Sequence, residues 1–247
     1  MSIVVRKGFV NRAMGAAVVA AAVAGAGAII ATTAPVVAQE EVFELPRAAL
    51  DPASTSTQET VILAGGCFWG VQAVFQHIDG VLSAVSGYSG GAADTAEYYT
   101  VTTGTTGHAE AVELVYDPSV ISYGEILRVF FSVVHDPTQL NRQGPDVGTQ
   151  YRSHVYYTTD AQRQVTEAYI AQLDAANIYG APIVTRVGQL EAFYPAEDYH
   201  QDYLINNPNQ PYIVYWDLPK VANTERLFPE YWRDPPITVA ATRPDLV

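Results

Sequence analysis

The chain has 247 residues, 49% of them apolar, which is enough to bury the core of a globular domain without covalent staples. Its 26 acidic side chains outnumber 13 basic ones and give a formal net charge of -13, so nucleic acid and anionic membrane surfaces are poor partners. Cys67 is the only cysteine, which excludes a disulfide within the chain.

Residues 1–38 show the pattern of a secretory signal peptide. Three basic side chains form its positive n-region: Arg6, Lys7 and Arg12. An Ala-rich apolar core spans 16–32, and small or modest residues at 36–38 precede Gln39. We therefore expect cleavage near Gln39 and export to the periplasm or the extracellular space. An uncleaved membrane anchor is the alternative, for which the apolar core is short.

Composition divides the rest of the chain into three parts. Residues 39–59 contain prolines and a Ser/Thr cluster, which predicts a linker. Residues 60–220 are predicted to form one domain. Residues 221–247 are predicted to be a packed C-terminal extension, to which the sequence assigns no function.

Cys67 lies at a predicted junction between a strand and a helix. The apolar, partly β-branched run 60–64 predicts the strand, and Gly65 and Gly66 permit a tight turn. An apolar stripe with helical spacing predicts the helix: Val71, Val74, Phe75 and Ile78. Cys67 would then occupy the first helical turn, where unpaired N–H groups and the positive end of the dipole favour a thiolate.

A buried, unreactive cysteine is the competing interpretation, because free cysteines are among the most buried residues. Trp69 favours the reactive interpretation. It lies off the apolar stripe beside Gln72 and Gln76, so its ring would project near the thiol on the wetter face of the helix. Phe68 continues the stripe and fits the core and a pocket equally well.

Glu110 is a second candidate for chemistry. In the alternating run 108–116 it shares a face with Val112 and Leu114, while Glu113 lies on the other face. If the face with Val112 is buried, desolvation raises the pKa of Glu110 and allows it to donate a proton at neutral pH. The alternative is a carboxylate at a strand end, solvated or paired with an arginine such as Arg152 or Arg186.

The second half of the chain alternates helices and strands. A capping box at 122–125, followed by an apolar helical stripe, predicts a helix that ends before Pro137. We then expect a strand at about 151–157, a helix at about 161–175 and a strand at about 183–187. This alternation is typical of a sheet covered by helices in an α/β or α+β domain.

Five segments occur in a characteristic order. The first is Gly66-Cys67-Phe68-Trp69-Gly70, and the others are 107–112, 116–118, 135–139 and 148–153. Together they resemble the motifs of the peptide methionine sulfoxide reductase A family, over roughly Val61 to Pro219. Five ordered motifs are far more specific than any one of them.

The resemblance implies an α+β fold, a two-layer sandwich with a ferredoxin-like core and a C-terminal extension. It also implies thiol-dependent reduction of methionine S-sulfoxide, free or in oxidised proteins and peptides, to methionine through a sulfenic acid on Cys67. Such an enzyme repairs proteins after oxidation. It needs no metal or bound cofactor, and we expect a monomer without a nucleic-acid partner.

The family's site residues carry over to matching positions. A thiolate must attack the sulfoxide sulfur while the oxygen, a poor leaving group, is protonated. Cys67 is then the nucleophile and Glu110 the acid. The other site residues are the phenols Tyr98 and Tyr151 around the oxygen, Phe68 and Trp69 around the substrate methyl group, and Asp146, which orders the site. Tyr99 is a rival for the position of Tyr98.

Two departures from the family pattern stand out. Many members carry further cysteines that attack the sulfenic acid, but Thr102 and the C-terminal region offer none here. The expected reductant is therefore external, either a small thiol or a thioredoxin-like protein. Pro145 also stands where Asn is usual before Asp146.

Other classes of function stay open on the residues alone. A cysteine hydrolase would need a histidine beside Cys67, and the candidates are His108, His135, His154 and His200. The run 197–200 holds Glu, Asp and His, a weak pattern for a metal site. A secreted binding module with a structural cysteine is the non-enzymatic alternative.

Overall fold

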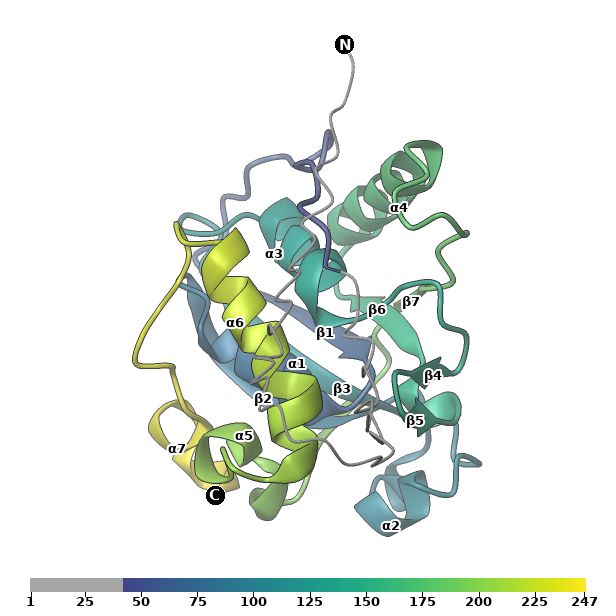
Figure 1. The fold of residues 1–247 in the computed structure, drawn as a ribbon, viewed down its shortest axis with the longest axis vertical. Coiled ribbons are helices and arrows are strands. Elements are labelled where there is room, and N and C mark those ends of the chain that lie inside the picture. Colours follow the sequence, from purple (N-terminus) through teal and green to yellow (C-terminus); the bar gives the residue numbers. More distant parts are fainter. Residues whose placement is uncertain (1–41) are drawn as a thin grey trace, which may run out of the picture.

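The structure, a computed structural model, describes residues 42–247. The predicted signal peptide and its cleavage site lie outside the described residues. Figure 1 shows one sheet with helices α1 and α6 in front of it, while α4 lies towards the β6–β7 edge. Within the described residues, no helix is long and apolar enough to cross a membrane.

The main sheet has six strands in the order β7-β6-β1-β3-β2-β8. Their bounds are β1 Glu59–Gly65, β2 Val81–Ser89, β3 Ala109–Tyr116, β6 Ser153–Tyr157, β7 Arg186–Gln189 and β8 Phe193–Pro195. Only β6 and β7 pair in parallel, and every other neighbouring pair is antiparallel. Two short strands, β4 Arg142–Gln143 and β5 Asp146–Val147, pair separately. A mixed sheet with helices makes this an α+β fold.

Four longer helices pack around this sheet: α1 Phe68–Gln76, α3 Tyr123–Val129, α4 Asp160–Ala175 and α6 Leu218–Leu227. Short helices are α2 Tyr98–Val101, α5 Tyr203–Asn206 and α7 Val239–Thr242. Two π-helical turns, Phe130–Val134 and Ile213–Asp217, continue α3 and precede α6. The predicted N-cap of α3 is present, because the Ser122 hydroxyl accepts from the Glu125 backbone N–H at 3.3 Å, while the Glu125 carboxylate accepts from Arg128 and does not complete the capping box.

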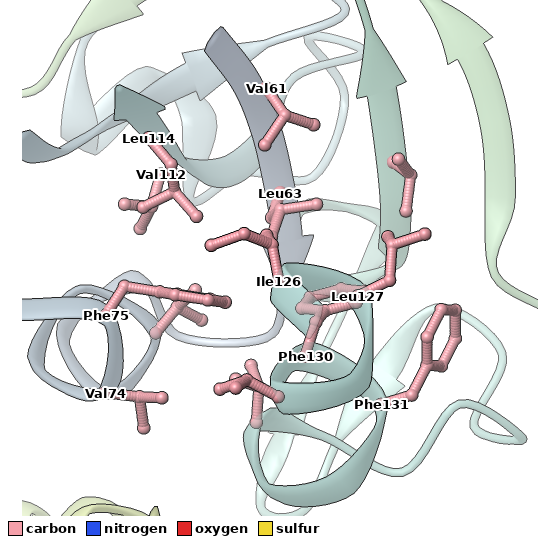
Figure 2. Packing of buried hydrophobic residues seen from close by; sticks show 14 of the residues in the cluster. Val61, Leu63, Val74, Phe75, Val112, Leu114, Ile126, Leu127, Phe130 and Phe131 are labelled. Atoms are coloured by element: carbon pink, nitrogen blue, oxygen red, sulfur yellow. The ribbon is translucent and has the colours of Figure 1, made fainter. Parts of the chain in front are cut away.

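The core lies between the sheet and the helices (Figure 2). It joins apolar side chains of β1 and β3 to those of α1, α3 and the following π-helical turn: Val61, Leu63, Val74, Phe75, Val112, Leu114, Ile126, Leu127, Phe130 and Phe131. All ten are fully buried, and each such side chain contributes about 1.5–3 kcal/mol of hydrophobic stabilisation. This core fixes the end of β1 and the start of α1, where Cys67 lies.

The structure confirms most of the predicted elements. The run 60–64 lies in β1, the run 108–116 matches β3, and the helix predicted at 161–175 is α4. β7 begins three residues later than predicted, at Arg186. The sequence patterns did not predict β2, although it lies next to β3 in the sheet.

The stretch predicted as a linker is packed on the domain over residues 43–51, so the prediction is wrong for this part. Phe43 and Leu45 are 7% and 2% exposed and belong to the main core. Asp51 accepts from the Ser122 hydroxyl at 2.6 Å and the Gly124 N–H at 2.9 Å. This segment is therefore anchored to the domain by the side chains of Phe43 and Leu45 and by the Asp51 carboxylate at the start of α3.

The end of the chain also packs against the domain. The boundary predicted between residues 220 and 221 falls inside α6. Phe228 is 1% exposed, and the Trp232 ring stacks on His77 with 4.5 Å between ring centroids. The Ile237 N–H donates to the Gln76 carbonyl, so residues beyond α6 cover the C-terminal end of α1.

Candidate active site

Cys67 occupies the N-cap position of α1, directly after the turn that follows β1. Its φ of -55° and ψ of 124° are not helical, so it lies one residue before the helix. The turn depends on Gly66, which has a φ of +93°, a region that other residues rarely adopt. A Cβ atom there would also lie 2.7 Å from the Gln143 side chain. Close packing of the β4 residue on this turn therefore sets the place of the thiol.

Burial governs the resting ionisation of Cys67. The side chain is 8% exposed, and burial raises the pKa of the thiol well above its usual value. The nearby carboxyls of Glu110 and Asp217 raise the pKa further, while the Trp69 backbone N–H lowers it by donating to the sulfur. The predicted preference for a thiolate is therefore wrong for the resting protein, because desolvation and negative charge outweigh the helix start.

Glu110 lies on β3 and approaches the turn that carries the thiol. Its carboxyl is 2% exposed, and Oε2 accepts from the backbone N–H of Phe68 at 3.0 Å. Burial raises the pKa of Glu110 to about 8, the hydrogen bond from the Phe68 N–H opposes this rise, and the charges of Asp146 and Asp217 add smaller increases. The buried face expected from the strand pattern is confirmed. Glu110 is not paired with Arg152, whose guanidinium donates to backbone carbonyls such as that of His108.

The two expected phenols flank this pair. Tyr98 begins α2 and is half-buried, and burial followed by the charge of Glu110 raises its pKa to about 12. Tyr151 ends a 3-10 turn before β6, and burial followed by Glu110 raises its pKa strongly. Cys67 acts on the pKa of both phenols. The rival Tyr99 is 75% exposed and turns away from this group.

The structure adds a third phenol, Tyr212, which the sequence analysis missed. Its hydroxyl donates to Asp146 Oδ2, and its pKa is raised by burial and then by Cys67. Asp146 thus orients the Tyr212 phenol near the thiol, which is a physical way in which it could order the site as expected. Nothing in the local sequence distinguishes Tyr212 from the other tyrosines, of which the chain has 16.

Phe68 and Trp69 form an aromatic wall next to Cys67. Phe68 is 1% exposed and lies 5.1 Å from the His200 ring, centroid to centroid. Trp69 stacks on Tyr203 at 3.8 Å, and its Nε1–H donates to His200 Nδ1 at 3.1 Å. Both rings are held by residues more than 130 positions away in sequence, which keeps the wall in one orientation.

The helix face beside Trp69 is not the wet face that the sequence suggested. Gln72 and Gln76 are both 1% exposed. Gln72 donates to Gln201 Oε1 at 2.9 Å, and Gln76 donates to Asp202 Oδ1 at 2.6 Å. The segment before α5 covers this face and satisfies its amides, as buried polar groups require.

The alternative chemistries find no matching geometry among residues 42–247. No histidine ring of this range hydrogen-bonds the Cys67 sulfur; the ring of His108 bonds Gly91 and Ala92, and that of His200 bonds Trp69. No group of three or more His, Cys, Asp or Glu side chains in the described part is placed to hold a metal ion. Glu197 instead accepts from the Tyr88 hydroxyl and the Tyr98 N–H.

The arrangement suits a reaction in which sulfur attacks and an oxygen leaves. A thiol, a carboxyl that keeps its proton at neutral pH and phenol donors converge from five separate elements. An apolar aromatic wall lies on one side of the thiol. These groups can hold a small neutral polar group, donate protons to its oxygen and exclude water from the sulfur.

Comparisons with known proteins agree with this chemistry. The model of the family described as peptide methionine sulfoxide reductase matches residues 59–231. Peptide methionine sulfoxide reductase MsrA 2 of Mesorhizobium japonicum is 59% identical over 190 residues, which cover 77% of this chain and 97% of the relative. MsrA 2 of Synechocystis sp. is 52% identical over 174 residues, which cover 70% and 81% of the two chains.

Two solved structures share the fold. Mxr1 from Saccharomyces cerevisiae in reduced form superposes with a TM-score of 0.57 at 32% identity, covering 66% of this chain and 92% of Mxr1. Methionine sulfoxide reductase A of Corynebacterium diphtheriae gives a TM-score of 0.54 at 36% identity, covering 67% and 82%. This chain therefore belongs to the peptide methionine sulfoxide reductase A family and is a peptide-methionine (S)-S-oxide reductase.

Proposed function

We propose that Cys67 is the nucleophile and Glu110 the proton donor of this reductase. The observation that carries the assignment is the 3.0 Å hydrogen bond from the Phe68 N–H to Glu110 Oε2, which holds this buried carboxyl at the turn that carries the thiol. Because the pKa of Glu110 is about 8, the acid keeps its proton at neutral pH. The thiol of Cys67 and the carboxyl of Glu110 are then both protonated and neutral until the substrate binds.

The remaining site residues bind the sulfoxide. The hydroxyls of Tyr98 and Tyr151 donate to the sulfoxide oxygen, and Asp146 orients Tyr212 on the same side. Phe68 and Trp69 contact the substrate methyl group. In the reaction the sulfur of Cys67 takes the oxygen, so thiol plus sulfoxide becomes sulfenic acid plus thioether, with no net gain or loss of protons.

Recycling of Cys67 needs two thiols from outside the chain. The first condenses with the sulfenic acid to a mixed disulfide and releases water, and the second releases the Cys67 thiol and leaves as a disulfide. A thioredoxin-like protein or a small thiol can supply both. The cysteine count supports this route, since no second thiol exists in the chain.

The setting of the reaction follows from the N-terminal pattern. We propose that residues 1–38 direct export to the periplasm or the extracellular space, where the enzyme repairs methionine S-sulfoxide in oxidised proteins and peptides, and reduces the free amino acid. The support is the basic n-region, the apolar core and the small residues before Gln39. Because such compartments are oxidising, the reductant must itself be supplied with electrons.

We also propose that the core is ferredoxin-like within a two-layer sandwich. The support is the chain order β1-α1-β2-β3-α3-β6 together with the sheet order β6-β1-β3-β2, antiparallel throughout. This is the split βαβ arrangement, with both helices available to one face. Such a layout places the end of β1 beside the start of β3, so that Cys67, after β1, and Glu110, on β3, lie close together.

Epimer-resolved turnover tests the assignment of the nucleophile. We expect Cys67→Ser to abolish reduction of the S epimer in a methionine sulfoxide peptide, because a serine hydroxyl is neither ionised nor able to accept the oxygen. The change is nearly isosteric, so circular dichroism should show an intact fold. Turnover above background in the folded variant would remove Cys67 from the mechanism.

A further inference from the structure

A buried ion pair lies behind the turn that carries Cys67. Asp217 ends the π-helical turn before α6, and Lys220 lies in the first turn of α6. Their side chains are 0% and 9% exposed, and Lys220 Nζ lies 3.6 Å from Asp217 Oδ1. Lys220 is also the only lysine after Lys7, so the rest of the chain carries all its other positive charges on arginines.

Asp217 lies against the first turn of the helix that Cys67 caps. A Cβ atom added to Gly70 would meet Asp217 Oδ1 at 2.2 Å and Cγ at 2.7 Å. The carboxyl therefore occupies the space that any other residue at position 70 would fill, three residues after the thiol. Glycine at this position lets a charged group approach the helix backbone closely.

The charge of Asp217 reaches both proposed reacting groups. It contributes to raising the pKa of Cys67 and that of Glu110, after the larger effect of burial. The other titratable groups around the thiol come from α2, β3, β5, the turn before β6 and the turn before α6: Tyr98, Glu110, Asp146, Tyr151 and Tyr212. These five groups are acids, while the His135 ring packs on the same turn at Gly65, where an added Cβ would lie 3.5 Å from its Cγ. Lys220 is the cation paired with the Asp217 carboxylate.

Packing alone gives little reason to keep this pair. Replacing a buried ion pair by apolar residues of similar volume is often neutral or stabilising, because desolvation of two charges offsets their attraction. An apolar pair would therefore join α6 to α1 at least as well. The Lys220 ammonium beside the Asp217 carboxylate instead reduces the negative electrostatic potential that the carboxylate produces at the nearby nucleophile.

We propose that Asp217 acts on the Cys67 thiol and the Glu110 carboxyl as a fixed negative charge whose strength Lys220 limits. The Asp217 charge favours the protonated forms of both groups in the resting enzyme. Lys220 offsets part of this charge, so that the Cys67 thiolate can still form during attack. Asp217 and Lys220 are thus positioning residues, which touch no substrate. The inference rests on the assignment of Cys67 and Glu110 in the proposed function.

The test compares Asp217→Asn, Lys220→Met and the double variant with the parent enzyme. Because Cys67 is the only cysteine, the absorbance change with pH that remains after subtracting that of Cys67→Ser, which has the same 16 tyrosines, reports the thiol pKa without turnover. The alkaline limb of kcat/KM reports Glu110. The exposed pair of Asp160 and Arg163 on α4, 3.2 Å apart, supplies the control variant Asp160→Asn.

Asp217→Asn is expected to lower the thiol pKa by about 0.5–1.5 units and to move the alkaline limb to lower pH, because a nearby negative charge is lost. Lys220→Met should shift both in the opposite direction, because it removes the cation that offsets the charge of Asp217. The double variant should fall between the single variants, and Asp160→Asn should leave both values unchanged.

Unchanged titration in Asp217→Asn, or a lower thiol pKa in Lys220→Met, would overturn the inference and leave the pair a structural contact. If Asp217→Asn does not fold, Lys220→Met is compared with Lys220→Arg, and only the loss of charge should raise the thiol pKa. A shift in the thiol titration without a shift in the rate profile would instead count against Glu110 as the acid, and so against the proposed function.

Discussion

At the residue scale, the two proposed reacting groups, Cys67 and Glu110, are both protonated before the substrate binds. Cys67 is buried among carboxyls that favour the thiol, and the Glu110 pKa of about 8 keeps the acid protonated. In the proposed mechanism a bound sulfoxide places its oxygen among the phenols, which stabilise the negative charge that develops on oxygen as the sulfur is attacked. Because the thiolate is the reactive form, a raised pKa lowers the reactivity of the resting thiol.

The acid gives the first prediction at this scale. We expect Glu110→Gln to lower kcat/KM by about 10²–10⁴, because the amide keeps the shape but delivers no proton. The protonated carboxyl is the active form, so the rate of the parent enzyme should fall as pH rises through about 8, and this limb should vanish in the variant. Steady-state rates from pH 6 to 10 measure both effects.

Glu113→Gln is the matched control, since Glu113 lies on the same strand but faces away and pairs with Arg243 at 3.8 Å. It should keep the rate and the alkaline limb of the parent enzyme. Full activity of Glu110→Gln at neutral pH would show that another group supplies the proton.

The sequence predicted the site residues only where local pattern determines their surroundings. Alternation along one strand sufficed to place Glu110 on the buried face, and a strand–glycine–helix junction sufficed to single out Cys67. The sequence did not predict Tyr212 and Asp217 as site residues, because their proximity to Cys67 depends on how the turn before α6 packs against α1. The thiolate expectation failed for the same reason, since local helix position says nothing about carboxyls from distant elements.

At the element scale, the junction between β1 and α1 is the critical turn. We expect Gly66→Ala to lower kcat/KM more than tenfold, because its φ of +93° is strained for alanine and the new Cβ would meet the Gln143 side chain at 2.7 Å. Displacement of β4 or of the turn then moves Cys67 away from Glu110, and small misplacements are costly in catalysis. Activity and thermal unfolding are measured together.

The control is Gly180→Ala, where φ is +72° but nothing lies within 4 Å of the added Cβ. It carries the backbone strain without the collision, so it should lose about 1 kcal/mol of stability and keep its activity. Equal loss of activity in both variants would mean that general destabilisation, and not the geometry of the turn, explains the effect at Gly66.

Elements were predictable where their periodicity is regular. α4 and β3 show clear stripes, whereas β2 reads VLSAVSGYS, with small and polar residues on both faces. Its place in the sheet comes from neighbours, and Gly87 leaves room for Phe193 of β8, whose ring would lie 2.4 Å from a Cβ there. Gln72 and Gln76 looked solvent-facing because their partners, residues 201 and 202, are distant in sequence.

At the scale of the whole molecule, residues 43–51 at the start of the described chain pack into the same core as the rest of the domain. We expect Leu45→Ala to lower the free energy of unfolding by about 2–5 kcal/mol, because Leu45 is 2% exposed and packs in the main core. Leu50→Ala, at a position that is 44% exposed, should change it by less than about 0.5 kcal/mol. Urea denaturation measures both, and equal midpoints would restore the interpretation of residues 43–51 as a linker.

A single thiol also defines the whole molecule's reaction cycle. After one turnover the oxygen taken from the substrate remains on Cys67, and no internal cysteine can remove it. We therefore propose that the enzyme is a one-cysteine reductase that depends entirely on an external thiol.

Single-turnover stoichiometry with intact-mass analysis tests this claim most directly. The purified protein is mixed with excess methionine S-sulfoxide peptide in the absence of any thiol, and product and protein mass are measured together. We expect one methionine per chain, with one oxygen atom gained at Cys67, and neither change in Cys67→Ser. More than one product per chain, or an oxygen located elsewhere, would contradict it.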